Sequence, residues 1–204
     1  MLTNQDIRSL HRAAVLASVD VVNDVTPNEL HRATPCDGWN LSHLLAHMTV
    51  QHRGFAAAAR GDGANPARWD TATVADAVAI DPAGTYAAAA ADVLEAFADD
   101  DVLAAPFALP EFGPGAVFPG SQAIGFHFVD YVVHGWDVAR AVDAPFVLPA
   151  DVIAAVLPLV LAVPDGDFRT APGSLFAPAI ATGEPISDLD RALLHLGRSP
   201  AWTP

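Results

Sequence analysis

The stretch WNLSHLLAHMTVQH, residues 39–52, places three polar side chains at intervals of four: His43, His47 and Gln51. Residues four apart lie on one face of an α-helix, so these three share a face if the stretch is helical. A pair of histidines four apart is weak by itself as a sign of a metal site, because many surface helices have one. No glutamate follows His43, so the pattern is not the HExxH motif of zinc metalloproteases.

The stretch HFVDYVVHGWD, residues 127–137, supplies a second set of side chains. At about 100° per residue, His127, Asp130 and His134 fall within a sector of roughly 60° on a helix. An aspartate and a histidine four apart on one face can both reach a single ion. One histidine from a facing helix would complete a three-ligand set that leaves coordination positions open.

Asp130 lies within an apolar run, where an unpaired carboxylate is unfavourable to bury. A metal ion or a neighbouring histidinium would stabilise it there. The alternative is an ordinary helix interface in which Asp130 pairs with His134 or with a backbone group. Spacing alone does not separate these interpretations.

The composition limits the classes of partner. The 204 residues carry a net charge of −14 and include no lysine, so a clustered basic face for nucleic acid is not expected. Anionic membrane surfaces are disfavoured for the same reason, and no apolar stretch reaches the roughly 20 residues that a membrane-spanning helix needs. The first residues do not resemble a signal peptide. The single cysteine, Cys36, excludes an internal disulfide and fits a reducing cytoplasm.

Apolar periodicity and helix-capping residues predict an all-α protein, an antiparallel bundle of four main helices with a small C-terminal helical and irregular extension. Thr3 and Asp6 resemble a capping arrangement at the start of the first helix. The expected helices cover residues 4–24, 40–61, 85–97, 121–142, 151–162 and 187–196. Glycines and prolines between residues 102 and 120 indicate a hairpin or an ordered loop. We expect residues 1–145 to form the metal-binding bundle, and 146–204 to pack on it without being an independent domain.

Three segments together, PCDGWNLSHLLAHM, HFVDYVVHGWDVARA and LLHLGRSPAW, resemble the mycothiol-dependent maleylpyruvate isomerase-like branch of the DinB superfamily. The resemblance is to its shorter actinobacterial members and covers nearly the whole chain. It implies a DinB-like four-helix bundle that holds a divalent metal, commonly zinc or nickel. It also implies a low-molecular-weight thiol such as mycothiol and an electrophile as small-molecule partners.

The resemblance further implies a ligand set. In that family the ligands are a histidine following a Gly-Trp motif, an acid, and a histidine four residues after the acid, which here are His47, Asp130 and His134. The isomerase has glutamate at the acid position, whereas this chain has the shorter aspartate. The helices would therefore have to approach more closely, or a water molecule would have to intervene.

Several neighbours of these ligands have two interpretations. Trp39 and Trp136 would line a pocket or anchor the core, and Asp137 would orient a ligand histidine or cap its own helix. His43 and His127 would carry protons near the metal or be rim and core histidines. Cys36 is expected to be a small buried residue rather than a redox thiol or a ligand. The four remaining histidines have no partner pattern and are treated as structural: His11, His31, His52 and His195.

Three functions share this ligand set, and the sequence identifies no catalytic residue beyond it. The first is a metal- and thiol-dependent transferase or isomerase, in which the metal activates the thiol for attack on an electrophile. The second is a metal-dependent hydrolase, which would need no thiol. The third is a non-catalytic metal-binding or sensor module. A homodimer is considered as an assembly state.

Overall fold

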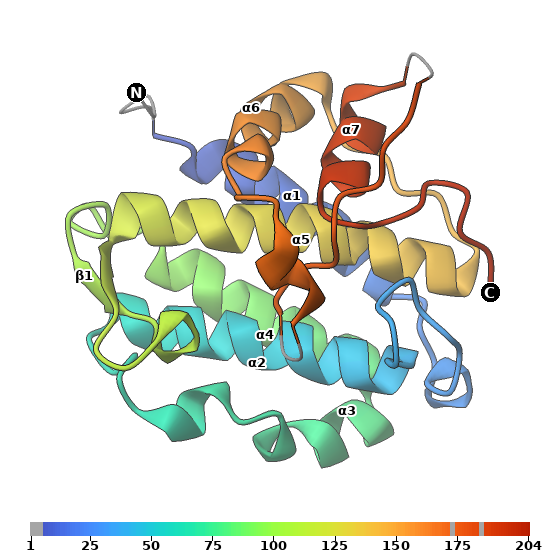
Figure 1. Ribbon diagram of the computed structural model, residues 1–204. Coiled ribbons are helices and arrows are strands. Elements are labelled where there is room, and N and C mark those ends of the chain that lie inside the picture. The colour runs from blue at the N-terminus through green and yellow to red at the C-terminus, as the bar shows by residue number, and fades with distance from the viewer. Residues whose placement is uncertain (1–5, 172–173, 184–185) are drawn as a thin grey trace.

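The computed structural model describes residues 6–171, 174–183 and 186–204, and its main body is a bundle of four helices (Figure 1). These helices are α1 (Arg8–Val22), α2 (Leu41–Ala59), α4 (Pro82–Ala96) and α5 (Gly120–Val142). α1 packs against α4 and α5, and α2 packs against the same two helices, so the four form a closed ring. α1 and α5 run in one direction, whereas α2 and α4 run in the other (Figure 1). The predicted all-α bundle is confirmed.

Shorter elements connect and extend the bundle. They are α3 (Ala75–Ile80), β1 (Pro106–Ala108), β2 (Val117–Pro119), α6 (Ala150–Leu161), α7 (Asp188–His195) and five 3-10 turns, at Pro27–Glu29, Pro66–Trp69, Thr71–Thr73, Pro110–Phe112 and Asp167–Thr170. The two strands form an antiparallel hairpin in which Phe107 lies opposite Phe118. This hairpin is one of the two forms expected between residues 102 and 120.

Side-chain caps begin several helices where the sequence indicates. Asn40 accepts the backbone N–H of His43 at 3.0 Å at the start of α2, and Ser187 accepts that of Asp190 at 3.0 Å at the start of α7. The first helix begins at Arg8 rather than at residue 4, and Asp6 accepts the Arg8 N–H at 3.0 Å. The other proposed capping residue, Thr3, lies outside the described residues. Two further differences are that α4 begins at Pro82 and that α3 was not expected.

Apolar packing between α2 and α5 fixes the separation of the two helices that carry the predicted ligands. Leu44, Leu45 and Met48 are fully buried, and they belong to one core cluster with Tyr131 and other residues of α5. The Tyr131 hydroxyl also donates a hydrogen bond to the Met48 carbonyl. Burying one such side chain stabilises the fold by about 1.5–3 kcal/mol, so this interface holds the ligand-bearing faces in register.

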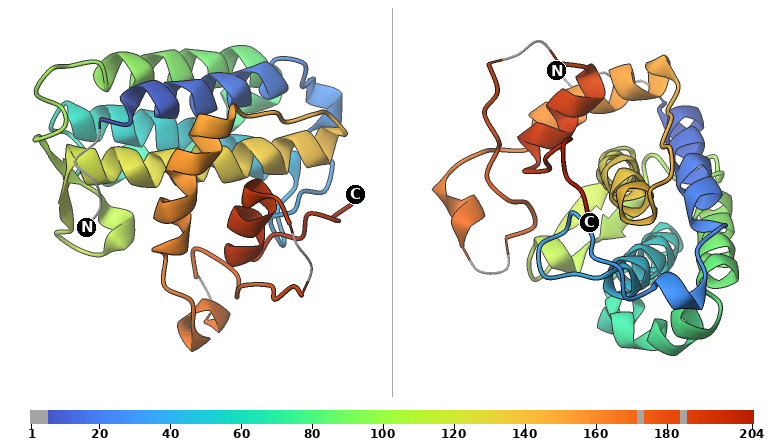
Figure 2. Two further views of the ribbon diagram at one scale, coloured as in Figure 1. Left: turned by 90° about the horizontal axis from the view of Figure 1, so that it is seen from above. Right: turned by 90° about the vertical axis from the view of Figure 1, so that its right-hand side faces the viewer.

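The C-terminal extension lies along one side of the bundle (Figure 2). α6 packs on α5 and α1, and α7 packs on α6. Arg169 is buried between them and donates hydrogen bonds to the carbonyls of Pro164 at 2.9 Å and His195 at 2.6 Å. Across the described residues, no helix combines the length and the apolar character that crossing a bilayer requires.

Candidate metal centre

The three predicted ligands lie together between α2 and α5. The donor atoms of His47, Asp130 and His134 all lie within 4.8 Å of one another. His134 Nε2 is 3.4 Å from Asp130 Oδ1, and the rings of His47 and His134 are 5.2 Å apart at an angle of 78°. Donor atoms around a tetrahedral zinc ion are about 3.4 Å apart, given bonds of about 2.1 Å. Small side-chain rotations would therefore bring the three donors, called here the ligand trio, to coordination distance.

Asp130 provides a test of whether these residues fit a divalent ion. Its Oδ2 atom is buried and has no hydrogen-bond partner. Leaving a buried carboxylate oxygen unpaired is unfavourable, and a cation between the three side chains would satisfy it. Two imidazoles and one carboxylate are also common ligands of zinc and related metals. The ligand trio therefore fits a divalent metal ion.

The other ring nitrogen of His134, Nδ1, contacts a carboxylate on the side of the ring that faces away from Asp130. His134 Nδ1 lies 2.9 Å from Asp137 Oδ2. Asp137 is fully buried, and the same oxygen accepts hydrogen bonds from the Cys36 thiol at 3.1 Å and from Arg198 at 3.2 Å. A histidine that donates its Nδ1 proton to a carboxylate presents the Nε2 lone pair to a metal. Of the two interpretations of Asp137, the geometry fits the orienting one.

The charges around the ligand trio act differently on its two histidines. Burial lowers the pKa of His47 to about 4, although Asp130 opposes the shift. Burial also opposes protonation of His134, but Asp130, followed by Cys36 and Asp137, raises its pKa well above the ordinary value. His47 would thus be available as a neutral ligand, whereas His134 would have to release a proton for a metal to bind.

The open side of the ligand trio is bordered by residues from two further segments. Glu111, in the loop of the β-hairpin, accepts a hydrogen bond from Gln51 Nε2 at 3.1 Å. Glu111 as a residue is exposed at the surface, but desolvation of its carboxyl group by surrounding atoms raises its pKa to about 7; Asp130 adds to the shift and the Gln51 hydrogen bond opposes it. Trp39 lies 5.0 Å from the His47 ring and is 37% exposed. Glu111 was not singled out in the sequence, where its only signal is an acid inside a short apolar segment.

Three other residues considered for the pocket lie elsewhere. Trp136 is buried in a core cluster with residues of α6, as its anchoring interpretation requires. His43 is exposed on α2 and does not belong to the ligand trio. His127 is fully buried in the bundle interior, so it is a core histidine and not part of the ligand trio.

His127 belongs to a separate chain of three buried histidines. Its Nδ1 lies 2.8 Å from His11 Nε2, and its Nε2 lies 3.2 Å from His52 Nδ1. Tyr131 stacks on His52 and His127 at ring distances of 3.9 and 4.2 Å. Burial lowers the pKa of His11 to about 3 and those of the other two well below the ordinary value. His11 and His52, which have no partner pattern in the sequence, therefore have partners here.

Comparison with known proteins identifies the family of this chain. A family model described as the mycothiol maleylpyruvate isomerase N-terminal domain matches residues 11–139, a range that includes the ligand trio. The chain belongs to this family. The resemblance seen in the sequence is thereby confirmed.

Relatives and solved structures extend the family assignment. Two uncharacterized proteins of Mycobacterium tuberculosis, MT0763 and Rv0738, are each 28% identical to this family member over 189 residues, which is 93% of this chain and 96% of theirs. The crystal structure of the mycothiol-dependent maleylpyruvate isomerase matches with a TM-score of 0.57 at 18% identity, over 76% of this chain and 66% of that one. A histidine-to-alanine mutant of the isomerase matches equally well at 16% identity. The matched part is just under two thirds of the isomerase chain, and at such identities the likeness establishes the DinB-like fold.

Proposed function

We propose that this protein binds a divalent metal ion, zinc or nickel, through His47, Asp130 and His134. We further propose that it uses a low-molecular-weight thiol of the mycothiol class in a transfer or isomerisation reaction. The observation that carries the proposal is the arrangement around His134, whose Nε2 lies 3.4 Å from Asp130, whose ring lies beside that of His47, and whose Nδ1 contacts the buried, charge-paired Asp137. Such outer support is characteristic of metal-binding histidines.

The openness of the ligand trio supports a reactive centre over a structural one. Structural zinc sites usually have four protein ligands, often cysteines. Within the described parts of the chain, no fourth histidine, cysteine or carboxylate completes the ligand trio at the same spacing. Cys36 is the only cysteine, and it lies on the Nδ1 side of His134 at 3.7 Å.

The residues of the chain have distinct tasks in this proposal. A bound divalent ion would lower the pKa of a thiol beside it and stabilise negative charge on the electrophile. Asp137 keeps the His134 ring in the orientation that directs Nε2 to the ion. Glu111, with a pKa of about 7, is suited to accept the proton of the thiol and return it to the electrophile.

A metal-dependent hydrolase would use the same three ligands with water as the nucleophile, and a sensor module would use them without turnover. The family favours the thiol, because the solved isomerase is described as mycothiol-dependent. Thiol dependence of turnover separates the first two functions, since a hydrolase needs no thiol.

Direct thiol binding to the metal centre can be tested with cobalt or nickel. The protein is loaded with either metal and titrated with mycothiol while thiol-to-metal charge-transfer absorbance is recorded. We expect a saturable band for the native protein and none for His47→Ala. A fully loaded native protein that develops no band with mycothiol would refute the thiol-dependent function.

A further inference from the structure

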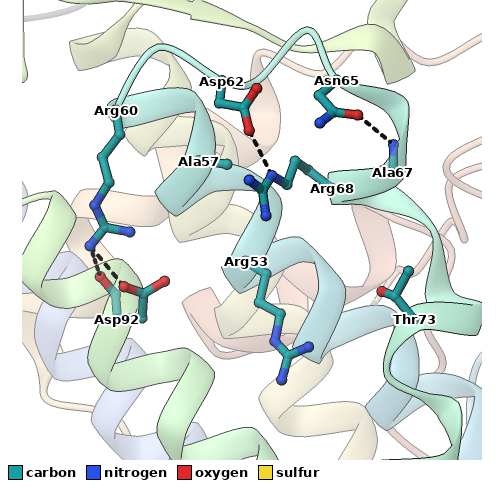
Figure 3. Close-up of a pocket in the computed structure, with 9 residues that line it drawn as sticks. All are labelled: Arg53, Ala57, Arg60, Asp62, Asn65, Ala67, Arg68, Thr73 and Asp92. Atoms are coloured by element: carbon teal, nitrogen blue, oxygen red, sulfur yellow. Dashed lines mark hydrogen bonds and ion pairs between the residues drawn. The ribbon is translucent and has the colours of Figure 1, made fainter.

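A second concave site lies on another side of α2, with a volume of about 760 Å³ (Figure 3). It is bounded by α2, by the segment that follows it and by Asp92 of α4. Arg53 follows His47 by six residues and therefore lies about 120° around the helix from it. The cavity thus opens on a different face of α2 from the ligand trio.

Three of the ten arginines of the chain line this cavity: Arg53, Arg60 and Arg68. Arg60 Nη2 pairs with Asp92 Oδ1 at 2.7 Å, and Arg68 Nε pairs with Asp62 Oδ2 at 2.7 Å. Arg53 has neither a hydrogen bond nor an ion pair with any described residue, and its guanidinium lies in the lower part of the view in Figure 3, below the Arg68 guanidinium. Because both aspartates are matched by their own arginines, Arg53 gives the cavity one excess positive charge in a chain of net charge −14.

The polar groups that are still available in the cavity are mainly hydrogen-bond donors. Arg68 contacts Asp62 through Nε, so its two terminal nitrogens remain free for a ligand. Asn65 uses its side-chain oxygen to accept the Ala67 N–H at 3.2 Å, so its amide nitrogen also remains (Figure 3). The N–H donors of two guanidinium groups and one amide on the lining of one cavity match the acceptor oxygens of a phosphate or carboxylate group.

The wall that carries Asn65 and Arg68 is fixed against α2. Trp69 covers Gly54, where even a methyl group would collide with the indole ring. The Trp69 Nε1–H donates to the Gly63 carbonyl at 2.8 Å, and its ring lies 5.4 Å from that of Phe55. Holding donors in place before a ligand arrives reduces the entropy lost on binding.

We propose that this cavity, defined by Arg53, Arg68 and Asn65, binds a small organic oxyanion that carries a phosphate or carboxylate group, at a site separate from the metal centre. Its volume lies within the roughly 300–1,000 Å³ usual for small-molecule sites and exceeds what an inorganic ion needs. The proposal is independent of the thiol chemistry, because no residue of the ligand trio takes part in it.

Isothermal titration calorimetry with inorganic phosphate and with succinate, at constant ionic strength set with sodium chloride, tests the proposal. We expect saturable binding of at least one probe, and the stronger probe identifies the class of group. Arg53→Gln should weaken this binding by about tenfold or more, the effect of losing a charge-assisted hydrogen bond. Asp62→Asn should strengthen it, because Arg68 is then released from a competing carboxylate.

The matched control is Arg12→Gln on α1, since Arg12 is also exposed and has no hydrogen bond or ion pair with a described residue. This variant should bind the probe as the native protein does. All variants alter exposed side chains, and circular dichroism would verify their folding. Absence of saturable binding of both probes, or equal weakening by the Arg53 and Arg12 variants, would overturn the proposal.

Discussion

α2 and α5 each contribute one histidine to each of two groups, and the surroundings of the two groups differ. His47 and His134 meet Asp130 at a place where His47 and Asp130 are half-buried, whereas His52 and His127 meet His11 fully buried in the bundle interior. Carboxylates raise the pKa of His134 in the first group. In the second group, burial lowers the pKa values of all three histidines.

The neighbours of each group explain the difference. The interior histidines are surrounded by aromatic rings, from Tyr86, Phe97 and Tyr131 among others, and by one another. No carboxylate is in contact with them among the described residues, so nothing there balances a positive charge. Histidines on the same two helices thus differ in chemistry because Asp130 and Asp137 accompany only one group.

The largest effect is expected from removing a histidine of the ligand trio. His134→Ala should abolish stoichiometric metal binding, because the variant lacks the ligand that Asp137 orients. His52→Ala, made on the same pair of helices, should retain the metal. Metal content after dialysis, measured by mass spectrometry, checks both. Full metal content in His134→Ala would show that the ligand trio is wrong.

Acidification should change the free energy of unfolding in opposite directions through the interior histidines and through His134. For each interior histidine the folded pKa lies below the unfolded value of about 6.5, so below that pH only the unfolded chain takes up the proton. Each such histidine should therefore lower the free energy of unfolding by about 1.4 kcal/mol per pH unit below pH 6.5. His134 has the opposite sign: its raised pKa contributes stability below pH 6.5, and this is lost as pH rises through the folded pKa.

Urea unfolding of metal-free protein between pH 6.5 and 5.5 measures this dependence. His127→Gln should remove about 1 kcal/mol of the change in the free energy of unfolding between these two pH values, because only half of the unfolded histidine is protonated at pH 6.5. The exposed control His43→Gln should leave the slope unchanged. A slope that is the same in His127→Gln and in the native protein would mean that the interior histidines do not resist protonation.

A smaller loss of metal affinity is expected when the three ligands are kept and only the carboxylate behind His134 is changed. Asp137→Asn should weaken metal binding about 10- to 100-fold, the usual consequence of losing a carboxylate behind a metal-bound histidine. Asp143→Asn is the matched control, because Asp143 lies exposed at the end of the same helix in a left-handed conformation that asparagine tolerates. Competition with a coloured chelator measures the affinities. Equal affinity in both variants would show that Asp137 does not orient His134.

Features that depend on residues close together in the sequence could be predicted from it. Helical periodicity and caps such as Asn40 placed the four main helices, since both depend on residues within a few positions of one another. The spacing of Asp130 and His134 is likewise local. The meeting of this pair with His47 required a facing helix, which the family resemblance supplied.

Contacts between residues far apart in the sequence could not be predicted, because no local pattern indicates them. His11 and His127 are 116 residues apart, and neither has a local pattern that indicates the other. Glu111 reaches the open side of the ligand trio only because the hairpin folds back over α2, where Gln51 lies 60 residues away. α3 has only six residues, too few for helical periodicity to reveal it.

Arg198 bears on the order in which the site is assembled. It contacts Cys36 across 162 residues and Asp137 across 61, so the network behind His134 ties the C-terminal segment both to α5 and to the segment that precedes α2. Contacts that close long loops form late in folding, because the chain entropy must be lost before the contact can stabilise anything. The His134–Asp137 contact joins residues three apart on α5 and needs no long loop to close, whereas the buried Asp137 carboxylate gains its guanidinium partner only when Arg198 docks. During synthesis, the charge-paired form of Asp137 would therefore follow the arrival of the C-terminal segment.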